Sequence, residues 1–494
     1  MPLENDVVRL LTADRLHGRT QIFTNKKEIT AENVAEVLES ALAADNRNVA
    51  EINYLYDVYR GIQDIQHKVK IVRPQVNNKV VVNLANYIVT FKDAYLLSSP
   101  VQYIAATGED NISAAVDELN NFMYAEDKES KDKRLVNWMH ICGVSPRMVL
   151  PNPAYDKNDS DSSPALLYAL DPREAFVIYY SGIGRRPMAG VLKQYDEDGE
   201  QIYYVYTKDG MYTVKKNQVT DYAVYDYGRV PIVEYVNNAA RIGAFEVVLS
   251  PLNSVNTLES NRIDNVVDFV NAYDVFKNCE IDSKTYSDLT AGGQAIMIRS
   301  TMGLDASVTR ISSELNQTGV QTNIDDLLAY IDVICGLPNR NGGSSTSDTG
   351  TATIYRDGWA DAESRADDTE KLFVESEKEI LKLILKIFRE KTDIDLNLKQ
   401  VKVKFTRKNL ANIQSKAQVL CELLNNSKVH PKIAYLVSGA LPDVEEAYRM
   451  GMEWYEQQEE RTAAELEKEI ERERSVHNDR QDNRPDEPED DTEV

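Results

Sequence analysis

The sequence predicts an α+β protein that is mainly helical, and three observations carry this prediction. Before residue 144 and after residue 244, apolar residues recur every three or four positions, a spacing typical of amphipathic helices. From about 144 to 236 the chain changes to short runs rich in Tyr and Val, separated by turn signals, which is typical of antiparallel strands. With 494 residues, 42% of them hydrophobic, the chain is long enough for more than one core.

The N-terminal part is expected to be helical. Residues 1–72 have helical spacing of their apolar positions. In the stretch that follows, Leu84, Ile88, Phe91 and Tyr95 are spaced by four, three and four residues and form one face of a helix. Two further helices are expected before the chain changes character near residue 144.

The central part is expected to be an antiparallel sheet of the meander type. Its short runs, such as "AFVIYY", "QIYYVYT" and "MYTVKK", have the composition of strands. The dipeptides Asp198-Gly199 and Asp209-Gly210 favour the tight turns of hairpins. This segment therefore predicts a β-rich subdomain within a helical chain.

A long helical segment is predicted over residues 244–278. Proline is tolerated in the first turn of a helix but not in its interior, so the continuous helix is expected to start at Pro251 and to cover residues 252–278. Its apolar positions form a narrow seam: Leu252, Val255, Ile263, Val266, Val270 and Tyr273. Many other positions are polar: Asn253, Asn256, Asn261, Asp264 and Asn265. A helix with this pattern is expected to pack sideways against copies of itself and not inside a deep core.

The stretch "GLPNRNGGSSTSDTG", Gly336 to Gly350, separates two helical segments. Two short strands, 295–299 and 306–312, and a helix, 322–335, are predicted before it. After it we expect, in order, a helix over 352–391, a strand within 396–407, helical segments up to 474, and a tail, 475–494. The tail has almost nothing apolar to bury and is expected to be disordered.

The motifs of common catalytic sites are missing from the sequence. The Gly336–Gly350 stretch does not predict a phosphate loop, because a helix precedes it and it contains no Lys. GxSxG, HExxH, GxGxxG and EF-hand patterns are absent, and the histidines lie in unrelated segments: His17, His67, His140, His430 and His477. We therefore expect no catalytic residue, no cofactor and no metal site.

The composition indicates the compartment. The four cysteines lack metal-ligand spacing and are expected to be reduced thiols: Cys142, Cys279, Cys335 and Cys421. The N-terminus has no signal-peptide pattern, and no apolar run approaches the ~18 residues of a membrane span. The net charge of −24 argues against tight, non-specific binding of nucleic acid. The sequence thus predicts a soluble intracellular protein.

Three segments together resemble one known family. They are "KVVVNLANYIVTFKDAYLLSSPVQY" (79–103), "YGRVPIVEYVNNAARIGAFEVVLSPLNSVNTLESNRIDNVVDFVNAYDVF" (227–276) and the helix–loop–helix through "IDVICGLPNRNGG". Over roughly residues 40–450 the chain resembles phage portal proteins of the SPP1 type. The first segment departs from the family, since it has Ser98-Ser99-Pro100 where a Gly-Lys-Pro-like turn is common.

The resemblance implies a portal fold that assembles as a ring, usually a dodecamer, around a DNA tunnel. The parts it implies are a wing (1–251, β-rich at about 144–236, and 352–408), stem helices (252–278 and 322–335), a clip (279–321), a tunnel loop (336–351) and a crown (409–474). The seam residues of the first stem helix would pack between subunits. The tunnel-loop residues would be Asn339, Arg340, Asn341, Gly342, Gly343, Ser344, Ser345, Thr346 and Ser347.

The resemblance also implies partners and a location. Double-stranded DNA would pass through the tunnel, where an acidic lumen would not hold phosphates as basic side chains do. The clip would contact the terminase large subunit and later a head-completion adaptor, and the wing would face scaffolding and major capsid proteins. Such a late protein assembles in the host bacterial cytoplasm and resides at the portal vertex of the virion, where the genome is packaged and ejected.

Alternatives stay open at this point. An enzyme, such as a nuclease or ATPase domain, is disfavoured because its motifs are missing. Another virion structural or adaptor protein without a DNA tunnel is the remaining alternative. For Arg340, the one basic residue of the Gly336–Gly350 stretch, both a weak DNA contact and a solvated loop charge fit the sequence.

Overall fold

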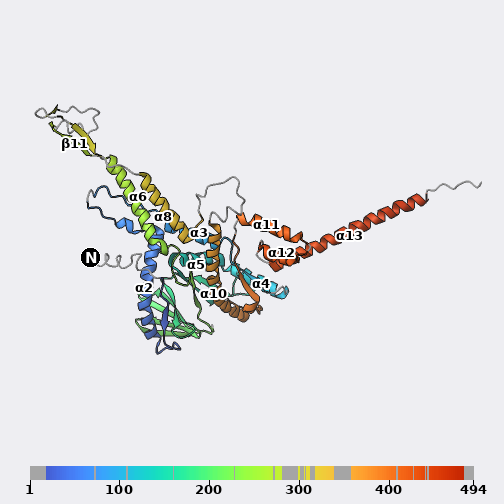
Figure 1. Ribbon diagram of the computed structural model, residues 1–494. Coiled ribbons are helices and arrows are strands. Elements are labelled where there is room, and N and C mark those ends of the chain that lie inside the picture. Colours follow the sequence, from blue (N-terminus) through green and yellow to red (C-terminus); the bar gives the residue numbers. More distant parts are fainter. Residues whose placement is uncertain are drawn as a thin grey trace, which may run out of the picture.

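The computed structural model describes most of the chain, and every structural statement below refers to the residues it describes. They are 18–71, 74–106, 110–159, 161–226, 228–270, 273–280, 299–300, 305, 307–311, 317–338, 358–407, 410–426, 428–439, 441 and 444–482. Figure 1 shows a central body from which two parts project, an arm that contains α6, α8 and β11 and, on the other side, the helices α11, α12 and α13.

One part of the body is a six-stranded sheet covered on one face by helix α2 (Val34–Arg60). The strand order is β1-β5-β6-β7-β8-β9, in which β1 runs parallel to β5 and all other neighbours are antiparallel. The strands are β1 (Ile22–Thr24), β5 (Ala175–Tyr180), β6 (Pro187–Tyr195), β7 (Gln201–Tyr206), β8 (Gly210–Lys215) and β9 (Gln218–Val224). The predicted hairpins at Asp198-Gly199 and Asp209-Gly210 are confirmed, because they join β6 to β7 and β7 to β8.

The second part of the body is a three-stranded antiparallel sheet surrounded by helices. Its order is β10-β3-β4, with β3 (Val144–Pro151), β4 (Ala165–Ala169) and β10 (Ile232–Val236). A two-stranded antiparallel pair, β2 (Gln102–Ala105) with β15 (Val401–Lys404), and the turn η4 (Leu398–Gln400) lie beside it. The helices are α3 (Leu84–Leu96), α4 (Asp110–Ala125), α5 (Lys128–Cys142) and α10 (Trp359–Lys391). The apolar face of α10, including Phe373, Ile380 and Phe388, fills this core.

The arm consists of α6 (Leu249–Val270) and α8 (Gln317–Cys335) and ends in short strands. The strand pairs are β11 (Tyr273–Lys277) with β14 (Ser307–Ile311) and β12 (Cys279–Glu280) with β13 (Arg299–Ser300), both antiparallel. The body end of both helices is held in a core that it shares with α2, α3 and α5. Two short turns, η2 (Asp64–His67) and η3 (Glu246–Val248), flank the base of the arm.

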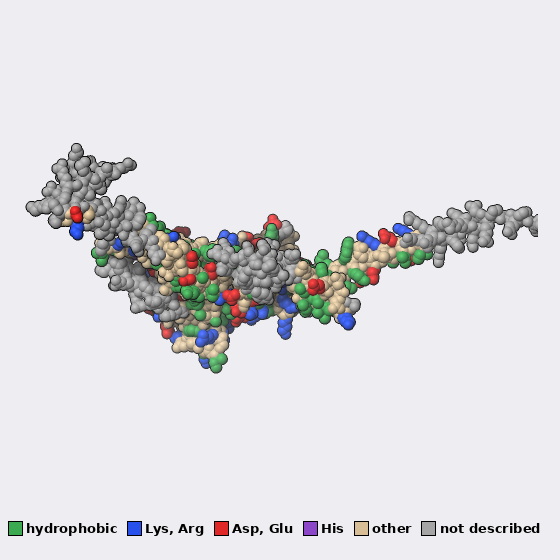
Figure 2. Space-filling view, turned by 45° about the horizontal axis from the view of Figure 1, so that its top comes forward, with side chains coloured by type: hydrophobic (Ala, Val, Ile, Leu, Met, Phe, Trp, Pro, Cys, Tyr) green, Lys and Arg blue, Asp and Glu red, His purple; other side chains and the backbone are tan. Residues whose placement is uncertain are grey.

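The described residues of the C-terminal projection form three helices: α11 (Leu410–Leu424), α12 (Pro431–Ser438) and α13 (Val444–Asp482). Figure 2 shows hydrophobic side chains exposed among charged ones along this projection. The architecture confirms a mixed α+β chain, and about half of it is helical.

Besides the start of α8, which lies at Gln317 and not at residue 322, three predicted boundaries are wrong. The long helix ends at Val270, and Tyr273 begins β11, because its Tyr-, Val- and Phe-containing segment pairs with Ser307–Ile311. Residues 22–24, predicted to be helical, form β1, because their backbone completes the edge of the six-stranded sheet beside β5. Helix α13 continues to Asp482, into the predicted disordered tail, because the preceding residues 465–474 are rich in Glu, Lys and Arg, which favour a helix that extends past residue 474.

Candidate functional site

The arm is built from two helices that one arginine joins. Arg262 of α6 donates from Nε to Oε1 of Gln317 and from Nη1 to Oε1 of Gln321, each at 2.7 Å, and both glutamines belong to α8. Figure 1 shows the two helices running side by side away from the body. The two helices that the sequence analysis expected as a pair are therefore in contact, although α8 begins at Gln317 and not at residue 322.

Three buried polar side chains on α6 hold a neighbouring extended segment. Asn256, Ser260 and Asp264 are spaced by four residues, lie on one face of the helix and are at most 2% exposed. Their oxygens accept backbone N–H groups, in order those of Val82 (2.8 Å), Val80 (2.9 Å) and Asn78 (2.7 Å). The match is geometric, because four helical residues rise ~6 Å and two extended residues span ~6.6 Å.

The last member of this row, Asp264, carries a buried charge. It accepts from Nδ2 of Asn78 at 2.8 Å and pairs with Nζ of Lys68 at 3.0 Å and of Lys70 at 3.6 Å. Burial by itself would raise the pKa of Asp264, but the hydrogen bonds from Asn78 and the charge of Lys68 outweigh burial and lower it. The carboxylate therefore ties residues 68 and 78 to the arm.

The residues that predicted packing between subunits lie in two environments. Leu252 and Val255 belong to the core of the chain itself, at 3% and 1% exposed. Ile263 and Val266, further out on α6, are 40% and 43% exposed. Asn256, which the sequence analysis took as a sign of contact with other copies, is buried within the chain because the segment 78–82 covers it.

A glycine ends α8 at the base of the arm. Gly336 has φ of +67°, in the left-handed region that favours glycine. Its N–H donates to the carbonyl of Val333 at 3.3 Å, and the N–H of Leu337 donates to that of Asp332 at 2.8 Å. These two bonds form a Schellman motif, which satisfies carbonyls that a helix end leaves without partners.

The start of α10 is fastened to this helix end. Arg365 of α10 donates from Nη1 to the carbonyl of Ile334 at 2.8 Å, and a Cβ on Gly336 would lie 2.3 Å from Cδ of Arg365. A Cβ on Gly358, directly before α10, would lie 3.7 Å from Cα of Pro338. The two ends of the segment 339–357 are thus held side by side.

The predicted tunnel-loop residues fall within that segment and lie outside the described residues. They are Asn339, Arg340, Asn341, Gly342, Gly343, Ser344, Ser345, Thr346 and Ser347. Their role stays a prediction.

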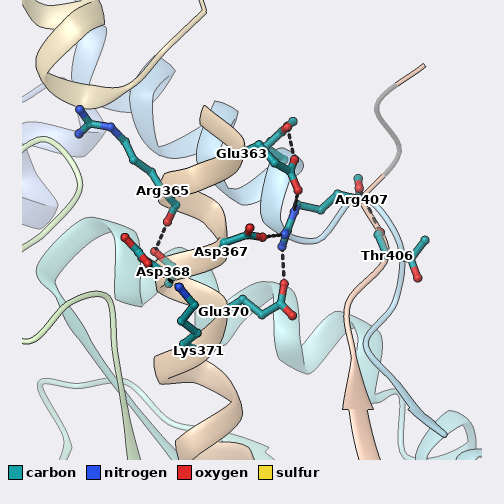
Figure 3. Close-up of polar contacts among 11 residues, drawn as sticks. Glu363, Arg365, Asp367, Asp368, Glu370, Lys371, Thr406 and Arg407 are labelled. Atoms are coloured by element: carbon teal, nitrogen blue, oxygen red, sulfur yellow. Dashed lines mark hydrogen bonds and ion pairs between the residues drawn. The ribbon is translucent and has the colours of Figure 1, made fainter. Parts of the chain in front are cut away.

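A second arginine joins the chain that leads into α11 to the first half of α10 (Figure 3). Arg407 contacts three carboxylates on one face of α10: Glu363 at 2.9 Å, Glu370 at 2.5 Å, and Asp367. Glu363 also accepts from the hydroxyl of Tyr95 at 2.5 Å. Burial alone would lower the pKa of Arg407, but its carboxylate partners raise it, so the guanidinium stays charged.

A closed network of charges lies in the core beside α10. Glu377 is fully buried and contacts Nζ of Lys128 at 3.0 Å and Nη1 of Arg147 at 3.2 Å. It also accepts from the hydroxyls of Tyr103, at 2.7 Å, and Tyr235. Burial alone would raise the pKa of Glu377, but Lys128 and Arg147 outweigh burial and hold it at about 2.

The same network includes a second acid, Asp132, which pairs with Lys128 at 2.6 Å and with Arg147. Two acids and two bases balance each other, and the groups come from α5, β3 and α10. Sequence reasoning missed it, although a charged residue within the apolar face of α10 between Phe373 and Ile380 was a signal.

The described residues offer no arrangement for catalysis. No group of three or more His, Cys, Asp or Glu among them is placed to hold a metal ion. His140 contacts Asp93 at 2.6 Å in the core, and burial raises the pKa of Cys142 to about 12 and that of Cys335 to about 11, so both thiols are protonated. No helix in the described parts of the chain is long and apolar enough to cross a membrane.

Comparison with known proteins adds one match. The family described as phage portal protein, SPP1 Gp6-like, matches residues 38–473. The match includes the arm, the buried charge network, the Arg407 cluster and most of the C-terminal helices. No curated protein matches the chain.

Proposed function

Because the chain belongs to the SPP1 Gp6-like family of phage portal proteins, which form the DNA-packaging portal at the capsid vertex, we propose how its parts serve that portal. Proteins of this family are structural and not enzymes, and as oligomers they interact with DNA and terminase. For this chain we propose a ring, a dodecamer, whose tunnel carries double-stranded DNA.

The arm is the proposed stem. Its helices α6 and α8 project from the body, and the part of its tip from residue 279 to residue 321 is the proposed clip that contacts terminase and later a head-completion adaptor. The support is that both helices keep apolar side chains exposed beyond the body, such as Ile263, Val266 and Tyr330. Exposed apolar groups on a projecting helix pair are accounted for when a neighbouring copy covers them.

The two sheets with α2, α3, α4, α5 and α10 form the proposed wing, 1–251 and 352–408, which faces scaffolding and capsid proteins. The helices α11 to α13 belong to the proposed crown, 409–474. The contacts of Arg407 support this division, because this residue binds three carboxylates of α10 at the point where the chain leaves the proposed wing for the proposed crown.

The segment 336–351 is the proposed tunnel loop. One observation carries this proposal: Pro338 and Gly358 lie together at the base of the arm, so the chain between them leaves and returns at a single place. In a ring, the copies of this segment would be arranged around one circle. Its Gly, Ser and Asn residues, with Arg340, would give weak contacts that let DNA slide.

Deletion of Asn341–Thr349 tests this role. We expect rings that assemble, as seen in electron micrographs, but that package less DNA protected from nuclease. Replacement of the same residues by an equal number of Gly and Ser is the matched control, and it distinguishes the effect of loop length from the effect of the loop side chains. A deletion variant that no longer forms rings, or that packages DNA normally, would contradict the proposed role.

A further inference from the structure

A segment with two different faces lies along α6, and it is extended on either side of a turn at residues 74–75. We call residues 68–71 and 74–80 the strap. Lys68 and Lys70 reach Asp264 of α6, while Val69 and Ile71, which alternate with them, are 84% and 93% exposed. The alternation is that of an extended chain, so one face of the strap is bound to the arm and the other is apolar and uncovered.

The outer face of α8 is also apolar and exposed. Ile324, Ile331 and Cys335 form the buried side of the helix. The opposite side carries Tyr330 and Val333, at 60% and 70% exposed, with Asp325, Asp326 and Ile334 beside them. We call these five exposed residues the α8 face.

The strap and α8 lie on opposite flanks of α6. Ser260 accepts from the strap side, at Val80, and Arg262 donates to α8, at Gln317. Positions two apart on a helix differ by ~200° in direction, so these side chains point to nearly opposite sides. Figure 1 shows α6 between α8 and the extended segment on its other side. The order across the arm is therefore strap, α6, α8.

The two outer surfaces differ in charge. The sequence from Asp64 to Asp93 contains no acidic residue between these two, and the strap carries Lys68, Lys70 and Lys79. Lys68 and Lys70 share one carboxylate, that of Asp264, and Lys79 donates to a carbonyl, so the strap and Asp264 together keep an excess of positive charge. The sequence from Arg310 to Arg340 contains no basic residue between these two, and the α8 face carries two aspartates. The apolar centres of both surfaces thus have flanking charges of opposite sign, an arrangement that favours their contact and disfavours contact of either surface with itself.

We infer that the strap of one subunit docks on the α8 face of the next subunit in the ring. The inference rests on the proposed function, since a ring requires a heterologous contact in which two different surfaces of one chain meet. Val69 and Ile71 lie against Tyr330 and Val333, and the excess positive charge of the strap attracts the aspartates of α8. The buried row on α6 positions the strap for this contact.

Disulfide cross-linking tests the contact. The doubly substituted chain, Ile71→Cys with Val333→Cys, is made in a background in which Cys279 and Cys421 are replaced by Ser, and is oxidised after assembly. We expect a ladder of covalent oligomers on a non-reducing gel. A mixture of the two single variants should give dimers only, because each subunit then carries one introduced thiol and can form one cross-link. The matched control pairs Val333→Cys with Ile183→Cys, which is fully exposed elsewhere, and should stay monomeric on the gel.

The outcomes separate this inference from the proposed function. Rings in electron micrographs without a ladder would overturn the docking of the strap and leave the ring standing. Dimers from Ile71→Cys alone would also overturn it, because they indicate a contact of the strap with itself. Absence of rings from the unsubstituted protein would overturn the proposed function.

A second variant checks the contact without cysteine chemistry. Ile71→Asp changes a side chain that is 93% exposed, so the subunit should keep its fold, by circular dichroism, while rings decrease at least tenfold. Ile183→Asp is the matched control and should assemble normally. Normal assembly of Ile71→Asp would count against the inference.

Discussion

The buried charge network predicts a large effect of a small change, Glu377→Gln. The substitution keeps the shape of the side chain, but it replaces one of the two oxygens that accept from the Tyr103 and Tyr235 hydroxyls by an amide donor and removes the charge that faces Lys128 and Arg147. One positive charge of the network is then left without its balance in a site that is closed to water. Loss of one partner from a buried ion pair costs ~3–5 kcal/mol.

The pKa of Glu377 gives an independent magnitude. Its fall from 4.5 to about 2 corresponds to ~3 kcal/mol of stability in the ionised form, at ~1.4 kcal/mol per pKa unit. A folded-state pKa below the unfolded one means that this stability is present above pH 4.5 and is lost as the pH falls toward 2. We therefore expect Glu377→Gln to lower the free energy of unfolding by about 3 kcal/mol at pH 7, and the difference to shrink below about pH 4.5.

Urea unfolding followed by circular dichroism measures this difference. Glu379→Gln is the matched control, because Glu379 lies on the same helix and pairs with Arg229 at 2.8 Å, but both side chains are more than 40% exposed. Such an exposed pair contributes at most ~1 kcal/mol. If Glu377→Gln destabilises no more than Glu379→Gln, or if its effect is the same at pH 7 and pH 3, the charge of Glu377 does not stabilise this core.

Three further predictions concern the arm and the wing. Gly336→Ala should lower the melting temperature, because a left-handed backbone costs a non-glycine residue ~1–2 kcal/mol and the new Cβ would collide with the Arg365 side chain. The control Gly199→Ala, with φ of +77° but open space around it, should lower it less. Equal shifts of the two melting temperatures would show that the collision with Arg365 has no cost. Asp264→Asn should speed tryptic cleavage of the strap, and unchanged cleavage would show that the ion pairs do not hold it. Arg407→Gln should lower the free energy of unfolding in urea by ~1–2 kcal/mol. An equal decrease for Arg229→Gln, which loses one exposed ion pair, would show that the three carboxylate contacts of Arg407 add no stability.

Local patterns explain what could be predicted from the sequence. The hairpins at Asp198-Gly199 and Asp209-Gly210 depend on two adjacent residues, and α3 and α10 on apolar spacing within one segment. Such signals do not need the rest of the chain. The end of α6 depends on a distant part of the chain. Val270 and Tyr273 continue the apolar spacing of the helix, but Tyr273 belongs to a strand because its segment pairs with residues 307–311.

The partner of the buried row on α6 could not be found from the sequence. Asn256, Ser260 and Asp264 show a regular spacing, and polar residues at that spacing are also typical of a solvated face. Their partners lie more than 170 residues earlier in the chain. Burial therefore depends on tertiary structure, which explains why the sequence argument took Asn256 and Asp264 as evidence against a place in a deep core.

Pro338 and Gly358 lie close together, so the chain between them closes a loop whose two ends are fixed by the surrounding structure. The entropy of closing a loop grows slowly, by ~0.6 kcal/mol for each doubling of its length. Residues can therefore be gained or lost at this position while α8 and α10 keep their places. Under the proposed function, portal proteins that share this junction would be free to evolve different apertures on one scaffold, and the position is a natural place to insert a reporter peptide.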